Sequence, residues 1–317
     1  MCRREQEATL PPGPRRGLGV TPSRARRDRW AGVWGAVAAI WVVGALPVAP
    51  EAEAQASNAD GEAAAADAKP VPFGPGELKL YEAKLGPVPV GEGRLEVHGI
   101  EEVRDQETYH LSLSLEGGIP LARVDDQQTS WLDVRELMTH RFIQDLHQVR
   151  YERYREYEIF PEDRYFDISD REEPEEMITD QPLDEIAFLY YVRSLPLEVG
   201  DKYELNRYFQ EDGNPVLLKV VREEEVETPA GTFETVVVRP TIETSGIFSE
   251  GGEAEVYFSN DDRRLLVKLH SRVPALPGSL SLLLEEVREG DPLQEWTPDM
   301  RHEAAERYRN NAGGGSP

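Results

Sequence analysis

The chain has 317 residues, of which 60 are acidic and 35 are lysine or arginine, giving a formal net charge of −25 at pH 7. A negative field of this size repels nucleic acid and anionic membrane surfaces, so both are excluded as predicted partners. The only cysteine, Cys2, lies at the start, so the rest of the chain has no disulfide, thiol nucleophile or cysteine metal site.

The N-terminal segment has the pattern of an export signal. Four arginines between residues 24 and 29 precede an apolar stretch over 30–46, and small residues follow at Ala52, Ala54 and Ala56. This pattern predicts an export signal over residues 1–56. An uncleaved membrane anchor over 30–46 is the alternative, because a helix of this length spans about 25 Å, slightly less than a bilayer core.

The charges around this segment predict where the remainder of the chain lies. Arginines precede the apolar stretch and glutamates follow it, which places the following residues outside the cytoplasm. We therefore predict a periplasmic or extracellular protein, or, if the segment is retained, a protein anchored in the inner membrane and facing the periplasm. The general and the twin-arginine export routes both remain open.

Composition divides the rest of the chain into three parts. Residues 57–71 have few large apolar side chains and are predicted to be a disordered tether. Residues 72–290 are long enough to bury a large core and are predicted to form one β domain. Residues 291–317 are polar, end in glycines and are predicted to be a tail.

Alternation of apolar and polar residues predicts strands throughout the β domain. In "TYHLSLSLEGG", Leu111, Leu113 and Leu115 should face the core, while the intervening serines face outward. In "ELKLYEAKL", Leu78, Leu80 and Ala83 occupy the predicted apolar positions, which should face inward. Short turns such as "EDGN", "SNDDR" and "PAGT" predict antiparallel pairing of the strands, which we expect at about 121–134, 137–151, 151–168, 201–210, 215–227, 232–243, 253–259, 264–273 and 279–288.

One segment has helical spacing instead. In "QPLDEIAFLYYVRSLPLEVG", Asp184 is a potential N-cap and Pro196 ends the pattern, so a helix is predicted at about 184–195. A single amphipathic helix among many strands must place its apolar face on the sheet. The predicted fold is mainly β, a single antiparallel, strongly curved sheet or open barrel with one covering helix.

Four segments, in order, resemble the bacterial domain-of-unknown-function family 3108. They are "FGPGELKLYEAKLGPVPVGEG", "PLDEIAFLYYVRSLPLEVGDKYEL", "VETPAGTFETVVVRP" and "GGEAEVYFSNDDRRLLVKLHSRVPALPGSLSLLL". The resemblance implies an exported, mostly β protein of uncertain function. The domain is also loosely similar to half-barrel periplasmic proteins such as the outer-membrane lipoprotein carriers. Neither resemblance supplies a catalytic residue.

Motifs for catalysis or cofactor binding are missing from the sequence. The chain has no nucleophile elbow, metalloprotease helix, phosphate loop or dinucleotide fingerprint, and its six histidines are scattered. Carboxylates are so abundant that a pair of them carries little information about hydrolysis. We therefore predict a non-enzymatic protein with no catalytic residues, no cofactor and no metal site.

The run "VRYERYREYEIF" is the most distinctive polar feature. As a strand it places Tyr151, Arg153, Arg155 and Tyr157 on one face. These residues either form a solvent-facing strand held by cross-strand pairs, or provide a platform of tyrosine and arginine for a glycan or an anionic polymer.

The predicted helix contains the second set of candidate residues, Phe188, Leu189, Tyr190 and Tyr191. They either fill the core or line a cavity large enough for an acyl chain. The leading functional hypothesis is an envelope protein that binds an amphipathic or lipid-like ligand on the concave face of its sheet. The alternatives are a structural adaptor that binds envelope proteins through its acidic surface and, least favoured, a glycan hydrolase.

Overall fold

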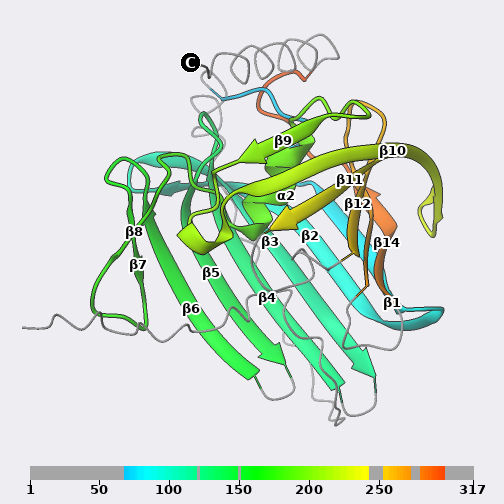
Figure 1. Ribbon diagram of the computed structural model, residues 1–317, viewed down its shortest axis with the longest axis horizontal. Helices are drawn as coiled ribbons and strands as arrows, with labels where there is room; N and C mark the ends of the chain where they lie inside the picture. The colour runs from blue at the N-terminus through cyan, green and yellow to red at the C-terminus, as the bar shows by residue number, and fades with distance from the viewer. Residues whose placement is uncertain (1–67, 120–121, 149–150, 243–252, 273–278, 297–317) are drawn as a thin grey trace, which may run out of the picture.

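Strands dominate the computed structural model, which describes residues 68–119, 122–148, 151–242, 253–272 and 279–296 (Figure 1). The predicted export signal, 1–56, lies outside these residues, as do most of the predicted tether and most of the predicted tail. No helix in the described ranges is long and apolar enough to cross a membrane.

The strands follow one another closely along the chain. In the N-terminal half they are β1 (Leu78–Leu85), β2 (Val88–Val103), β3 (Gln106–Ile119), β4 (Ala122–Asp133), β5 (Thr139–Gln148), β6 (Tyr151–Phe160), β7 (Tyr165–Ile168) and β8 (Glu175–Glu176). After the helix they are β9 (Lys202–Leu205), β10 (Val216–Thr228), β11 (Gly231–Ile242), β12 (Glu253–Ser259), β13 (Leu266–Arg272) and β14 (Ser279–Arg288), with a short 3-10 helix at Glu211–Gly213.

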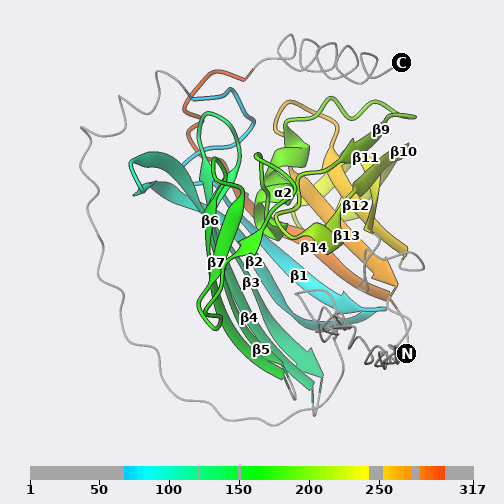
Figure 2. The ribbon, with the colours of Figure 1, turned by 60° about the vertical axis from the view of Figure 1, so that its left-hand side comes forward.

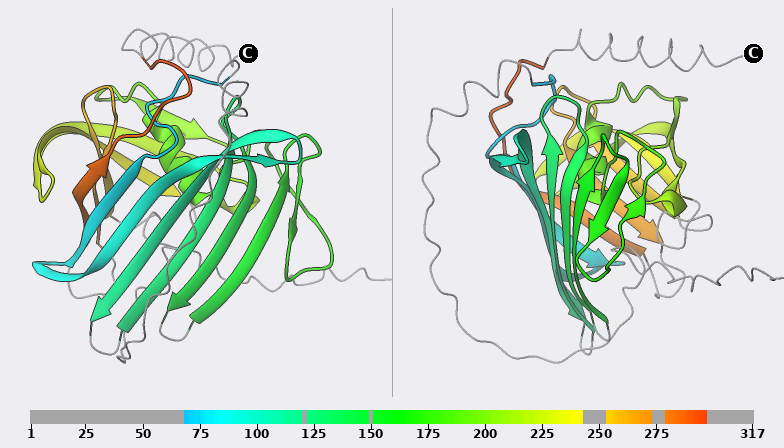
Figure 3. Two further views of the ribbon diagram at one scale, coloured as in Figure 1. Left: turned by 180° about the vertical axis from the view of Figure 1, so that it is seen from behind. Right: turned by 90° about the vertical axis from the view of Figure 1, so that its left-hand side faces the viewer.

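All these strands belong to one antiparallel sheet, in the order β8-β7-β6-β5-β4-β3-β2-β1-β14-β13-β12-β11-β10-β9. The first and last strands of the chain are therefore neighbours in the middle of the sheet. Strands β8 and β9 form its two edges and do not pair with each other, so the sheet curves without closing (Figures 2 and 3). The predicted mainly β, open and strongly curved sheet is confirmed.

One α-helix, α2 (Glu185–Arg193), lies between the two halves of the curved sheet (Figure 2). It packs on β3 and β4. Asp184 is its N-cap, as predicted, and its side chain accepts from the backbone N–H groups of Ile186 and Ala187. The predicted covering helix is thus present, two residues shorter at its C-terminal end than the sequence pattern indicated.

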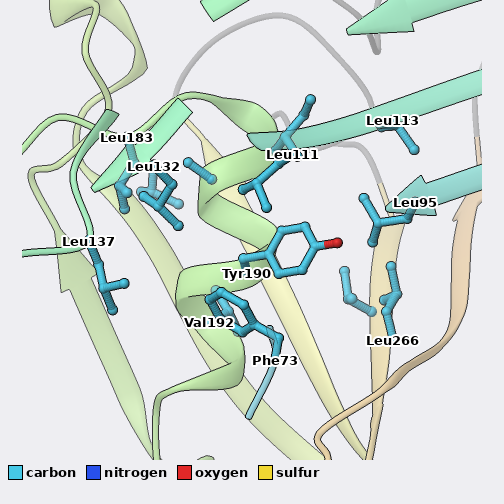
Figure 4. Packing of buried hydrophobic residues seen from close by; sticks show 14 of the residues in the cluster. Phe73, Leu95, Leu111, Leu113, Leu132, Leu137, Leu183, Tyr190, Val192 and Leu266 are labelled. Atoms are coloured by element: carbon cyan, nitrogen blue, oxygen red, sulfur yellow. The ribbon is translucent and has the colours of Figure 1, made fainter. Parts of the chain in front are cut away.

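The main hydrophobic core fills the space between α2 and the concave face of the sheet. Leu111 and Leu113 of β3 contribute to it, as predicted, together with Leu95 of β2 and Leu132 of β4. Tyr190 of α2 projects among these side chains (Figure 4). Each fully buried aliphatic side chain of this kind contributes about 1.5–3 kcal/mol to the free energy of unfolding.

The predicted inward face of β1 is wrong for Leu78 and Leu80, which are only partly buried. It is right for Ala83, which is buried together with Lys79 and Tyr81. A lysine occupies an inward position because Lys79 forms an ion pair with Glu77, itself held by Arg193. Because of this buried ion pair, Lys79 faces the core, whereas the alternation of leucines had indicated that Leu78 and Leu80 would do so.

The structure contradicts one prediction about the connections between strands and confirms another. The predicted strand over 151–168 is interrupted, since β6 ends at Phe160 and a turn with Arg164 at φ 56° precedes β7. The "PAGT" turn is a hairpin, as predicted: Thr228 pairs with Gly231, whose φ of 131° favours glycine.

Both ends of the described chain pack against the sheet. Ala68 and Val71 belong to the core although they lie in the segment predicted as a tether. Leu293, in the segment predicted as a tail, packs against the same core, and the backbone N–H of Asp291 donates to the carbonyl of Pro75 at 2.9 Å. Composition alone did not indicate these contacts, because these few apolar side chains lie in segments that are otherwise mainly polar.

Candidate functional site

The concave face changes from apolar to polar across the strands. The register places Leu95 of β2, Leu113 of β3, Gln128 of β4, Gln144 of β5 and Arg155 of β6 in one row. Because neighbouring strands present directly paired residues to the same face, this row runs from leucine side chains on β2 and β3 to polar side chains on β4–β6.

The next row is mixed. It contains Gly93, Leu115, Asp126, Leu146 and Arg153, so a leucine on β5 lies between the polar residues of β4 and β6. Strands β3–β6 extend well beyond α2 in this direction (Figures 1 and 2). These two rows therefore place apolar and polar side chains next to one another on the concave face.

The four candidate residues on β6 share one face, as the sequence predicted. Arg153 is partly exposed and its guanidinium donates to the hydroxyls of Tyr151 and Tyr157, both at 3.2 Å. Arg155 instead pairs with Asp170, with 2.6 Å between its Nη2 and the carboxylate. Tyr157 is buried among the core aromatics, so Arg153 and Tyr151 are the accessible members of this set.

The candidate residues on α2 separate into two environments. Tyr190 is fully buried, and its ring meets that of Phe73 edge-on at 4.8 Å. Phe188 and Tyr191 are partly buried against the core, with the guanidinium of Arg207 lying 4.4 Å from the centroid of the Tyr191 ring. Leu189 is also only partly buried. Tyr190 is therefore a core residue, whereas the side chains of Phe188 and Leu189 are partly accessible to solvent.

The N-terminus of α2 is tied to β4 and β5 by its cap. The Asp184 carboxylate accepts from the hydroxyls of Ser130 at 2.5 Å and Thr139 at 2.8 Å, in addition to the two helix N–H groups. Burial raises the pKa of Asp184, and these donors oppose the rise. The contacts fix the first turn of the helix over the polar side of the sheet.

Glu185 lies next to this cap and faces a group of polar side chains. Its Oε1 accepts from the Tyr208 hydroxyl at 2.8 Å and lies 3.5 Å from the amide nitrogen of Gln144. Its Oε2 is buried without a partner. Burial raises the pKa of Glu185 to about 7, and the charge of Asp184 adds to the rise.

Gln128 has the least satisfied side chain of this region. The residue is 1% exposed, and its side-chain carbonyl oxygen has no hydrogen-bond partner. It is the direct cross-strand partner of Gln144, which accepts from the Tyr157 hydroxyl at 3.4 Å. We refer to the group that these contacts connect as the concave polar cluster: Gln128, Gln144, Arg153, Tyr157, Glu185 and Tyr208.

Sequence reasoning found Arg153 and Tyr157 but missed the other four residues of the cluster. The signal that was available lies in "VDDQQTSWL", where Asp126, Gln128 and Ser130 share their parity with Leu132. Once Leu132 is assigned to the core, those polar residues must face inward as well. The positions of Glu185 and Tyr208 depend on tertiary contacts and had no such signal.

The histidines and acids of the described ranges do not gather into a group of three or more that would hold a metal ion. Outside the cluster, the buried charges of Glu77, Lys79 and Arg193 form one group, in which Arg193 at the end of α2 pairs with Glu77.

A family profile described as "Protein of unknown function (DUF3108)" matches residues 80–285 of the chain. The chain belongs to this family. The DUF3108 match extends from β1 to β14 and includes α2 and every residue of the concave polar cluster. No curated protein matches the chain.

Three solved structures resemble this DUF3108 chain. A β-barrel-like protein of the unknown-function family DUF1849 from Brucella abortus is 10% identical, with a TM-score of 0.43, covering 69% of this chain and 99% of that one. A candidate lipoprotein from Parabacteroides distasonis is 14% identical, with a TM-score of 0.30 and the same coverage. A candidate exported protein with a YmcC-like fold from Bacteroides fragilis is 13% identical, with a TM-score of 0.27, covering 70% and 100%.

Proposed function

We propose that this protein is a non-enzymatic envelope protein that binds an amphipathic, lipid-like ligand on the concave face of its sheet. The observation that carries the proposal is the row from Leu95 to Arg155, in which leucines on β2 and β3 are followed by polar side chains on β4–β6. An amphiphile laid across the strands would place its apolar chain on the leucines and its headgroup on the polar residues.

Partly accessible apolar side chains support a place for the apolar chain of such a ligand. Leu115 lies in the same row as Arg153 and is partly exposed. On the helix side, Phe188 and Leu189 are partly exposed as well. Apolar surface left open beside a hydrophobic core is typical of a binding site rather than of a fully packed interior.

An envelope location is part of the proposal. It is supported by the arginine-rich region and apolar stretch that precede the β domain in the sequence. Fractionation of the native cells should recover the protein outside the cytoplasm, either free or with the inner membrane. Recovery in the cytoplasmic fraction would contradict this part of the proposal.

Ligand binding is tested with the purified protein by extraction and mass spectrometry of copurifying lipids, and by titration with a fluorescent fatty acid. We expect saturable binding by the wild-type protein. Leu115→Glu should weaken it at least about tenfold, because the substitution places a charge on the surface that would receive the apolar chain.

Ser114→Glu is the matched control, since Ser114 precedes Leu115 on β3 and points to the opposite face. It should bind as the wild-type protein does. Absence of both copurifying lipid and saturable binding would refute the proposed function, and equal loss in both variants would remove the concave face as its site.

A further inference from the structure

The concave polar cluster contains buried polar atoms that the fold leaves without partners. The carbonyl oxygen of Gln128 and the Oε2 of Glu185 are buried and accept no hydrogen bond. Folded proteins pair nearly all of their buried polar atoms, since each unpaired one lowers stability. Other buried atoms of the described residues, among them the Tyr109 and Tyr190 hydroxyls, are also unpaired, but Gln128 and Glu185 are side chains on facing elements, β4 and α2, within one polar cluster.

Two contacts of Gln144 within the cluster are long. Its amide nitrogen lies 3.5 Å from Glu185 Oε1, and its Oε1 lies 3.4 Å from the Tyr157 hydroxyl. Hydrogen bonds measure about 2.7–3.2 Å from an N–H donor and about 2.5–3.0 Å from an O–H donor, so both contacts are weak. Weak contacts of this kind are readily exchanged for hydrogen bonds to a bound group.

The chemistry of the unsatisfied atoms specifies what would bind. Gln128 Oε1 needs a donor, and so does Glu185 Oε2 when its carboxyl is ionised, whereas the Arg153 guanidinium, which is partly exposed, offers N–H groups to an acceptor. When Glu185 is protonated, its O–H group donates and needs an acceptor instead. A hydroxyl group donates and accepts at the same time. A carboxylate or phosphate supplies no donor, and the net charge of −25 opposes its approach.

We propose that the concave polar cluster is the binding site for an uncharged polyhydroxyl headgroup, of glycerol or sugar type, on the amphipathic ligand. Hydroxyls of the headgroup donate to Gln128 Oε1 and Glu185 Oε2 and accept from Arg153. This inference rests on the proposed function and adds the chemical class of the ligand.

The test compares ligands that share one acyl chain and differ in headgroup. The purified full-length protein is titrated with glyceryl monododecanoate, dodecyl glucoside, methyl dodecanoate and dodecanoic acid. We expect the two hydroxyl-bearing ligands to bind at least about tenfold more tightly than the methyl ester, because only they satisfy the unpaired acceptors. The stronger of the two identifies the glycerol or the sugar type.

The decisive variant is Gln128→Leu. It should remove the preference for hydroxyl-bearing ligands over methyl dodecanoate, and its melting temperature should equal or exceed that of the wild-type protein, because a buried unpaired amide is replaced by an apolar group. Gln127→Leu is the matched control, since Gln127 is exposed on the opposite face of β4. It should keep the preference.

Three results would overturn the inference. They are tighter binding of dodecanoic acid than of glyceryl monododecanoate and dodecyl glucoside, retention of the hydroxyl preference in Gln128→Leu, and marked destabilisation by that substitution, which would show that Gln128 has a structural partner. In each case, if methyl dodecanoate still binds, the proposed function is supported and only the inference about the headgroup fails. If none of the four ligands binds, both proposals fail.

Discussion

At the scale of single residues, the most consequential feature is a charged group buried beside α2. Arg193 forms a forked pair with Glu77, each contact 2.7 Å long, and also donates to the backbone carbonyls of Pro72 and Arg264. Lys79, fully buried, shares the same carboxylate. One arginine thus joins the end of the helix to the segment before β1 and to the turn before β13.

The protonation of Lys79 makes the stability of the fold depend on pH. Burial and the charge of Arg193 lower the pKa of Lys79 to about 7, whereas the unfolded chain keeps it near 10.5. Between these values the unfolded state binds more protons, so the free energy of unfolding rises with pH. We expect a contribution of about 2 kcal/mol between pH 7 and pH 9, measured by urea denaturation.

Lys79→Met should abolish this rise, because the titrating group is removed while Glu77 keeps its pair with Arg193. Lys84→Met is the control, since Lys84 is partly exposed and pairs with Glu82 near the end of the same strand. It should leave the pH dependence unchanged. An identical slope in wild type and Lys79→Met would show that Lys79 stays charged in the folded protein.

At the scale of elements, α2 shows how a short helix is held inside a sheet. It has nine residues, too few for independent stability in water. Its N-terminus is fixed by Asp184 to Ser130 and Thr139, and its C-terminus by Arg193 to Glu77. Because Glu185 follows the cap directly, the same contacts set the position of the concave polar cluster.

Asp184→Ala should lower the free energy of unfolding by about 2–4 kcal/mol, because the helix loses its cap and two buried hydroxyls lose their acceptor. Hydrogen exchange at the backbone amides of Ile186 and Ala187 should accelerate more than elsewhere. Asp184→Asn is the matched control: its amide oxygen still caps the helix, so the loss should be smaller. Equal losses in both variants would mean that the carboxylate charge, not the cap, stabilises α2.

At the scale of the whole molecule, the sheet is held together where the two ends of the chain meet. Strand β1 pairs with β2 on one side and with β14 on the other. The half from β2 to β8 and the half from β9 to β13 are therefore joined through the first and last strands. The curvature that places α2 between the halves depends on this junction (Figure 3).

Ending the chain after residue 278 should prevent cooperative folding. The truncation removes β14, including Leu282 and Leu284 of the core, and leaves β1 and β13 each with one unpaired edge. The two buried leucines alone contribute about 3–6 kcal/mol, a large share of the 5–15 kcal/mol typical of a domain. Circular dichroism and thermal melting measure the loss, and a peptide of residues 279–296 should restore the transition. A single cooperative melt without the peptide would show that the halves fold independently.

Patterns of neighbouring residues predicted most strands and the helix because those patterns reflect local geometry. Leu111 and Leu113 alternate with serines and face the core, and Asp184 precedes a helical run and caps it. The same reasoning failed at Lys79, where an ion pair with a distant arginine overrides the preference of lysine for water. It also failed near Phe160, where charged residues continue through a turn.

The sequence by itself determined a mainly β fold with one capped helix, the shared face of Tyr151, Arg153 and Tyr157, and membership of the family suggested by four ordered segments. Those features depend on residues close together in the chain. Only the tertiary structure decided which polar residues face inward and which side chains meet. Arg193 and Glu77 lie 116 residues apart, and Gln128 faces the same concave side as Glu185, because strand order and register bring them together.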